Sequence, residues 1–186
     1  MNGIVIYKGK YGATEQYARW IGEELGLPVV DSKDIEENEL SYYDFLLIGT
    51  SVYIGKLQIQ NWLKDNLSYL RGKKIFLFQV AGTPPEEKEK RQAYNRASIP
   101  EEIMKDCEFY FLPGRMIMQK LSWKDRTMLK MGARLTKDPK AKKGMLTDYD
   151  NVRKENIAAL LNSVQEFSAI SKPIVKQTST LVPSEI

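Results

Sequence analysis

Short apolar runs alternate along the chain with longer segments in which apolar residues recur every three or four positions. The runs are continuous rather than alternating in hydrophobicity, which is typical of strands buried on both faces. Five such strands are predicted, at residues 3–7, 27–30, 43–48, 74–81 and 108–112. The longer segments have the apolar spacing of amphipathic helices. They predict helices at residues 14–25, 57–70, 85–104, with a break near Pro100, and 151–167.

Strands that alternate with helices indicate a parallel sheet that is covered by helices on each face. We therefore predict an α/β domain over residues 1–169, with a three-layer, doubly wound sheet of five parallel strands. Residues 170–186 are rich in Ser, Thr and Pro and lack periodicity. They are predicted to form an irregular C-terminal tail.

Residues 114–147 interrupt this alternation between the fifth strand and the last helix. Within them, residues 114–145 carry ten Lys and Arg and two Asp, a net charge of +8. The whole chain carries +4, so the positive charge is concentrated in this segment. The segment also contains several Met and Leu residues. Ser122 is predicted to cap a helix, with Asp125 in the acidic position of a capping box.

The residue content excludes several classes of active site. The chain contains no His, which excludes Ser-His-Asp triads, Cys-His pairs and His-containing zinc sites. Its one Cys, Cys107, excludes an internal disulfide and a cluster held by several thiolates of one chain. Cys107 opens a predicted buried strand and is expected to be a core residue. No metal site is predicted, so carboxylate, lysine, tyrosine or cofactor chemistry remains.

The N-terminal residues lack the basic and apolar regions of a signal peptide. No stretch reaches the ~18 apolar residues of a membrane-spanning helix. We therefore expect a cytoplasmic protein, and contact with the inner face of the cell membrane remains open.

Three loops follow the carboxyl ends of predicted strands, where ligands bind in open α/β sheets. The first loop leads into a helix, whose free N–H groups and positive dipole end favour a phosphate. It consists of Lys8, Gly9, Lys10, Tyr11, Gly12, Ala13 and Thr14. Its glycines allow close approach of a ligand, and its Thr and Lys side chains suit an anion. An ordinary strand–helix turn is the alternative, because the Walker A and G-x-G-x-x-G motifs are absent.

The second and third loops suit a flat heterocycle. The second contains two hydroxyl side chains and one aromatic ring, in Thr50, Ser51, Val52, Tyr53, Ile54 and Gly55. Tyr53 can lie against a planar ligand, or it can be a half-buried loop residue. The third loop has small residues whose backbone can hydrogen-bond to a planar edge. Its candidates are Ala81, Gly82 and Thr83.

Three loops of this kind on such a sheet resemble the flavodoxin-like family. In that family the first loop binds the phosphate of FMN, and the other two hold the isoalloxazine ring. The usual first loop is [ST]-x-T-G-x-T. Gly12 and Thr14 match it, whereas Gly9 and Tyr11 stand where the family has Ser or Thr. The resemblance implies that FMN is the cofactor and that the residues of the three loops bind it.

One branch is similar in more detail, the flavodoxin-like, menaquinone-dependent protoporphyrinogen oxidases of bacterial haem synthesis. That branch has a basic residue shortly before Gly-x-Thr, as Lys10 is here, and a long basic insertion before the last helix. Residues 122–131 and 146–152 look like that insertion and its exit. The resemblance implies an oxidoreductase that oxidises protoporphyrinogen IX and passes the electrons to a quinone. A flavodoxin-type electron carrier or a quinone reductase with an unassigned partner is the alternative.

The insertion provides candidates for contact with the substrate or with a membrane, namely Arg115, Lys120, Trp123, Lys124, Arg126 and Lys130. Cationic side chains suit the propionates of a porphyrinogen or an anionic membrane, and Met and Trp suit an apolar macrocycle or lipid. A solvated basic helix that packs its Met and Leu face on the domain is the alternative. Nucleic acid is not favoured, since Trp123 is the insertion's one aromatic residue. The sequence leaves a homo-oligomer open.

Overall fold

The computed structural model describes residues 1–84 and 86–170, so nearly all of the predicted tail lies outside the described residues. Five parallel strands form the central sheet in the order β2-β1-β3-β5-β6. They are β1 (Gly3–Lys8), β2 (Val29–Asp31), β3 (Phe45–Tyr53), β5 (Lys74–Ala81) and β6 (Cys107–Pro113). The short strand β4 (Lys56–Leu57) pairs antiparallel with the end of β3. The predicted sheet is confirmed.

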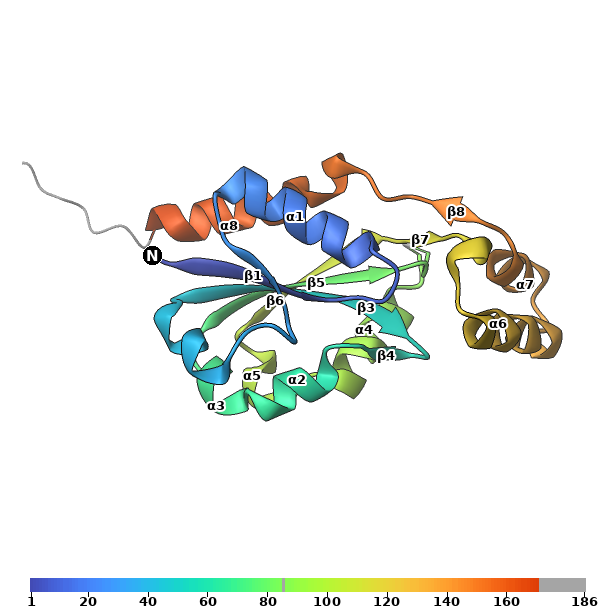
Figure 1. Cartoon of the computed structure of the whole chain (residues 1–186), viewed down its shortest axis with the longest axis horizontal. Coiled ribbons are helices and arrows are strands. Elements are labelled where there is room, and N and C mark those ends of the chain that lie inside the picture. The colour runs from blue at the N-terminus through green and yellow to red at the C-terminus, as the bar shows by residue number, and fades with distance from the viewer. Residues whose placement is uncertain (85, 171–186) are drawn as a thin grey trace, which may run out of the picture.

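Helices cover both faces of the sheet, as the three-layer prediction requires (Figure 1). One face carries α1 (Ala13–Leu25) and α8 (Ala158–Ile170). The other face carries α2 (Gln60–Asp65), α3 (Leu67–Leu70), α4 (Lys88–Ser98) and α5 (Glu101–Met104). Short 3-10 helices occur at η1 (Glu37–Tyr42), η2 (Met118–Lys120) and η3 (Lys154–Ile157). The expected break near Pro100 is present between α4 and α5.

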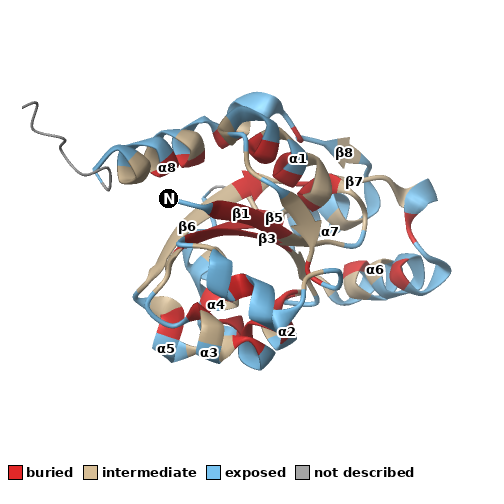
Figure 2. Ribbon diagram, turned by 60° about the vertical axis from the view of Figure 1, so that its left-hand side comes forward, coloured by how far each residue is buried: buried red, intermediate tan, exposed pale blue. Residues whose placement is uncertain are grey.

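The sheet separates two apolar cores, because successive side chains of a strand point to opposite faces. On β5, Phe76 and Phe78 pack under α1 and α8, whereas Ile75 and Leu77 face α2 to α5. Figure 2 shows the sheet as the buried layer between partly exposed helices. Burial on both faces explains why the strands have continuous apolar sequences. Cys107 packs against the second core, and burial raises the pKa of its thiol to about 12.

Strand β3 is longer than its sequence pattern predicts. The pattern ends the strand before Gly49, but the strand continues to Tyr53. A Cβ atom at position 49 would overlap the Phe78 ring, so this glycine makes room for an aromatic side chain within the sheet. Residues 50–53, predicted as loop, therefore belong to β3. The predicted helix 57–70 begins only at Gln60 and is divided into α2 and α3.

The insertion forms two helices beyond the carboxyl edge of the sheet (Figure 1). These are α6 (Trp123–Leu135) and α7 (Pro139–Leu146). In sequence they are flanked by two short strands, β7 (Arg115–Met116) and β8 (Tyr149–Asp150), which pair antiparallel with each other. Both ends of the insertion are fixed at Gly114. Its N–H donates to the carbonyl of Ala81 at 2.8 Å, and its carbonyl accepts from the N–H of Asn151 at 3.1 Å.

The close packing at Gly49 leads to a test of β3. We expect Gly49→Ala to lower the free energy of unfolding by about 1–3 kcal/mol, because the added methyl group forces the Phe78 ring or its strand to move. Urea unfolding, followed by circular dichroism, measures this difference.

Gly144→Ala is the matched control, because a Cβ atom there has no heavy atom within 4 Å. Gly144 lies in α7, where alanine is the better helix former, so its stability should be unchanged or slightly higher. Equal stability of the two variants would show that the ring does not constrain β3.

Candidate functional site

A cavity of about 370 Å³ lies at the carboxyl edge of the sheet, between the predicted loops and the insertion. We call it the edge cavity. Ten of the predicted cofactor residues line it: Lys10, Tyr11, Ala13, Thr14, Ser51, Val52, Tyr53, Ile54, Ala81 and Gly82. The tertiary structure thus brings all three loops to one space. Six predicted residues do not line it: Lys8, Gly9, Gly12, Thr50, Gly55 and Thr83.

The residues outside this lining have other places in the fold. Thr50 is fully buried, and its hydroxyl oxygen accepts from the N–H of Ile59 at 3.2 Å. Gly12 caps α1 in the left-handed conformation, with φ 81°. A Cβ atom at Gly9 would lie 2.7 Å from the side chain of Thr14. Gly12 therefore shapes the first loop through its backbone conformation, and Gly9 leaves room for the Thr14 side chain.

Two buried hydroxyl groups of the edge cavity are unsatisfied. Thr14 Oγ1, in the first turn of α1, and Ser51 Oγ, on β3, have no hydrogen-bond partner among the described residues. Buried hydroxyl groups normally have a partner, because an unpaired one loses its bonds to water without replacement. The N-terminus of α1 adds free N–H groups beside Thr14. This donor set fits the phosphate of FMN.

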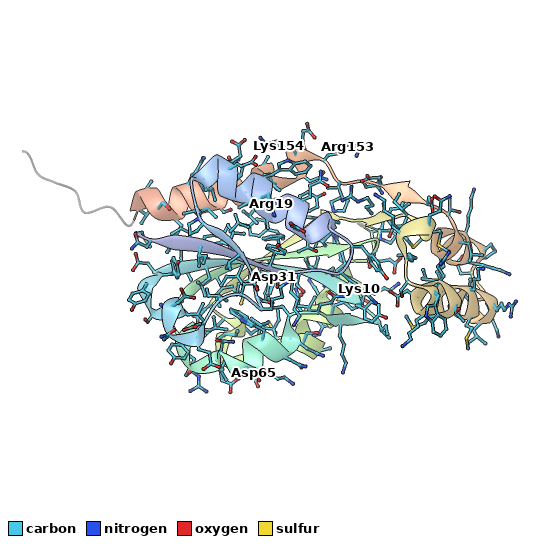
Figure 3. All side chains as sticks on the ribbon, in the orientation of Figure 1. Lys10, Arg19, Asp31, Asp65, Arg153 and Lys154 are labelled. Carbon is cyan, nitrogen blue, oxygen red and sulfur yellow. The ribbon has the colours of Figure 1, made fainter. Side chains whose placement is uncertain are left out.

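The residue that joins the loops to the insertion is Asp125, in the first turn of α6. It is only 4% exposed. Its carboxylate accepts hydrogen bonds from Lys10 Nζ at 2.7 Å, from the hydroxyl of Tyr53 at 2.6 Å, and from the hydroxyl of Tyr11. Figure 3 labels Lys10 at the edge of the sheet next to α6. One carboxylate therefore contacts both the first and the second loop.

The sequence predicted a different role for Asp125, and half of that prediction is confirmed. Ser122 caps α6 by accepting from the N–H of Asp125 at 3.2 Å. The Asp125 side chain turns toward the edge cavity, where its partners are Lys10, Tyr11 and Tyr53. The helical spacing of positions 125, 128, 129 and 132 indicates one face of α6 and could have placed this carboxylate toward the domain.

Charge pairing fixes the ionisation states in this cluster. Burial acts to raise the pKa of Asp125, but the hydrogen bonds from Lys10, Tyr11 and Tyr53 outweigh it and hold this pKa well below its usual range. The hydrogen bond to Asp125 raises the pKa values of Lys10 and Tyr53. At neutral pH the cluster therefore holds the Lys10 cation, the Asp125 carboxylate anion and a neutral Tyr53. Lys10 Nζ also lies 4.6 Å from the centre of the Tyr53 ring.

The insertion gives the edge cavity an apolar wall, whose residues were not named individually among the predicted site residues. This wall consists of Met116, Leu121, Met128, Leu129 and Met145. Tyr149 lies against Gly82, where a Cβ atom would overlap the tyrosine hydroxyl, and burial raises the pKa of Tyr149. Of the Met and Leu residues of α6, Met128 and Leu129 line the edge cavity, whereas Met131 and Leu135 are exposed and do not.

The six predicted contact residues of the insertion divide into two groups. Arg115 lines the edge cavity, and its guanidinium donates to Gln16 Oε1 at 2.9 Å and to Asp150 Oδ2 at 3.3 Å. The others lie outside the lining and are exposed: Lys120, Trp123, Lys124, Arg126 and Lys130. Trp123 is 68% exposed, which is unusual for so large an apolar side chain. The exposed group forms what we call the outer face of the insertion.

Comparison with known proteins agrees with this geometry. The sequence profile of the flavodoxin domain matches residues 4–143. A flavodoxin from the domain Archaea has 18% sequence identity, with 87% of this chain and 99% of that chain covered and a TM-score of 0.44. Smu.1420 from Streptococcus mutans has 10% identity, with 69% and 94% covered and a TM-score of 0.50. The two-electron reduced flavodoxin of Megasphaera elsdenii has 16% identity, with 77% and 95% covered and a TM-score of 0.45. No curated protein sequence matches the chain.

No helix within residues 1–84 and 86–170 has the length and apolar content needed to cross a membrane.

The Asp125 cluster leads to a test of stability against pH. The pKa of Asp125 is lower in the folded chain than in the unfolded chain, where it is about 3.9. Its contribution is therefore fully present above that value and is lost as the pH falls through the folded-state pKa. We expect Asp125→Asn to lower the free energy of unfolding by about 2 kcal/mol at neutral pH, with the difference shrinking below pH ~4.

Urea unfolding at a series of pH values measures this difference. Asp65→Asn is the control, because Asp65 is an exposed residue of α2 on the far side of the sheet from α1 (Figure 3). Its effect should be small at every pH. A constant difference between wild type and Asp125→Asn down to pH ~2 would contradict the ionisation states given for the cluster.

Proposed function

Since the chain belongs to the flavodoxin domain family and binds FMN, we propose that it is an oxidoreductase that oxidises protoporphyrinogen IX and passes the electrons to a quinone. The observation that carries this proposal is the insertion. It places an apolar wall and Arg115 over the edge cavity, and it presents a basic outer face with an exposed tryptophan. The edge cavity thus suits an apolar ring system with acidic substituents.

All three loops provide groups that would hold FMN. The Thr14 and Ser51 hydroxyl groups and the N–H groups at the start of α1 are donors for its phosphate. Lys10 adds a positive charge. Tyr53 and the backbone at Ala81 and Gly82 would border the isoalloxazine ring. When bound, the flavin supplies the two-electron redox chemistry that these side chains lack.

The insertion would exclude water from the reaction and position the substrate. Leu121, Met128 and Leu129 make the wall of the edge cavity apolar, and Met side chains adapt to the shape of a large ring. The guanidinium of Arg115 can bind a carboxylate in a charge-assisted pair. A porphyrinogen, which combines an apolar macrocycle with propionates, meets both requirements.

The outer face suits an anionic membrane, where a quinone acceptor is dissolved. Each Lys or Arg near such a surface contributes about 1 kcal/mol, so its cationic side chains suffice for reversible attachment. The exposed Trp123 can enter the interfacial region of the bilayer. We propose that this face brings the flavin close to the quinone. The protein would then work in the cytoplasm, on the inner face of the membrane.

A flavodoxin-type electron carrier is the second candidate, and the turn after β3 favours it. Ile54 is 67% exposed at the rim of the edge cavity. Its φ of 49° is in the left-handed region, which is strained for a β-branched residue. An exposed apolar side chain held in this way offers a contact for a partner protein near the flavin.

The FMN assignment is tested by absorbance titration of the FMN-free protein. Thr14→Val removes a hydroxyl group that has no partner among the described residues, so it should leave the stability of the FMN-free chain unchanged or slightly higher. FMN binding should weaken about tenfold or more, because a hydrogen bond to a charged phosphate is lost.

Thr127→Val is the matched control, since Thr127 Oγ1 donates only to the carbonyl of Trp123 within α6, at 2.9 Å. It should bind FMN as the wild type does. Equal affinity for FMN of the wild type and both variants would show that Thr14 does not bind the phosphate.

The proposed reaction is tested with FMN-loaded protein, protoporphyrinogen IX and anionic vesicles that contain menaquinone. We expect FMN-dependent oxidation of the porphyrinogen. The variant Lys124→Glu/Arg126→Glu should keep FMN but bind these vesicles at least about tenfold more weakly, since two attractive charges become repulsive. Its turnover with vesicle-bound quinone should fall accordingly.

Lys64→Glu/Lys105→Glu is the control with the same change in net charge, at exposed positions on and near the helices α2 and α5. It should bind vesicles and turn over substrate like the wild type. If FMN-loaded protein oxidises the porphyrinogen no faster than FMN-free protein, the electron-carrier function is favoured. If the charge reversal leaves vesicle binding unchanged, the membrane role of the outer face is wrong.

A further inference from the structure

A second cavity, of about 540 Å³, adjoins the edge cavity across the ends of β5 and β6. The two cavities share Ala81, Gly82 and Gly114. Its polar and charged lining, which the proposed reaction does not use, includes Gln79, Thr83, Arg91, Arg153 and Asn156. We call it the arginine cavity.

Gln79 is a buried polar residue in an apolar strand. It is 1% exposed, and its neighbours on the same face of β5, Ile75 and Leu77, belong to the second core. Both its amide nitrogen and its amide oxygen lack a hydrogen-bond partner in the described part of the chain. An apolar side chain would satisfy the packing at this position without leaving polar atoms unpaired. The amide is explained if a group in the arginine cavity bonds to it.

Two guanidinium groups give the arginine cavity a positive charge. Arg91 of α4 lies over the Phe111 ring, with its guanidinium carbon 4.5 Å from the ring centre. Arg153 lies before η3, near the upper edge of the molecule in Figure 3, and donates to the carbonyl of Val152 at 2.8 Å. The ion pair of Arg153 with Asp150 spans 3.9 Å and is therefore a loose one. No carboxylate occurs among the described residues that line the cavity.

We propose that the arginine cavity binds an oxyanion, a carboxylate or a phosphate, that belongs to the molecule exchanging electrons with the flavin. Guanidinium groups form paired hydrogen bonds with such anions, and the Gln79 amide adds a neutral donor. The edge cavity is near the lower end of the size range for ligand sites, about 300–1,000 Å³, so a flavin together with a second molecule that contacts the apolar wall needs more room than it holds. The adjoining arginine cavity provides that room. This inference rests on the proposed function of the edge cavity.

Binding is measured by ¹⁹F NMR with three probes of similar shape: 4-fluorobenzoate, 4-fluorophenyl phosphate and the neutral 4-fluorobenzamide. Both FMN-loaded and FMN-free proteins are titrated. We expect at least one of the two anions to bind, and the benzamide to bind at least about tenfold more weakly. The tighter of the two anions identifies the acidic group that the cavity accepts.

Arg91→Gln/Arg153→Gln should weaken binding of the anion at least about tenfold. Arg153→Gln alone is a milder variant, because that side chain is largely exposed and its loss leaves the core intact. Arg19→Gln/Arg71→Gln, at two exposed positions, is the matched control and should bind the anion like the wild type. Absorbance titration with FMN shows that each variant keeps its fold and its flavin.

Equal affinity for the benzamide, no binding of either anion, or undiminished anion binding by both arginine variants would overturn the proposal. Because the probes are titrated without turnover, this result is independent of the porphyrinogen assay. If the protein binds the anion but fails to oxidise the porphyrinogen, the anion site in the arginine cavity is supported and only the proposed substrate is wrong.

Discussion

The carboxylate of Asp125 connects parts of the chain that are at least 72 residues apart in sequence. It accepts hydrogen bonds from Lys10 and Tyr11 of the first loop and from Tyr53 at the end of β3. A buried carboxylate needs several such partners, because it has given up its hydration. The position of the insertion and the positions of both loops are therefore mutually dependent. Loss of this one side chain would remove these three hydrogen bonds and leave the one that the N–H of Ser122 donates to the Tyr11 hydroxyl.

Helix α6 directs its acidic and its basic side chains to opposite sides. Along α6, Asp125 turns inward, whereas its neighbours Lys124 and Arg126 are exposed. The basic character of the insertion is thus directed to solvent or to a binding surface, and the inner wall of the edge cavity is mostly apolar. Lys10 and Arg115 are the exceptions, since both are cations that line the cavity, and each has a carboxylate as its partner, Asp125 and Asp150 respectively.

The end of the sheet carries two adjoining spaces of different chemical character. The edge cavity combines apolar side chains with the hydroxyl groups of Thr14 on α1 and Ser51 on β3, which have no partner among the described residues, and it suits a cofactor with a planar ring and a phosphate. The arginine cavity combines two guanidinium groups with the buried Gln79 amide, which also lacks a partner in that part of the chain. The backbone at Ala81, Gly82 and Gly114 lies between them. The two spaces lie side by side, which suits the proposed arrangement of a flavin in one and an acidic group of its reaction partner in the other.

Local pattern determined most of the fold. The continuous apolar runs predicted five strands that are buried on both faces, and the loops after them were placed at the correct edge, because these features depend on neighbouring residues in the chain. Gly49 was misread as the end of a strand. A glycine is required there because the Phe78 ring of the neighbouring strand occupies the space of a Cβ atom. Asp125 was read as the acidic member of a capping box, and neither Gln79 nor Met128 was singled out. The roles of these residues depend on partners far away in sequence, and only the tertiary structure decides which partners a buried carboxylate, amide or thioether meets.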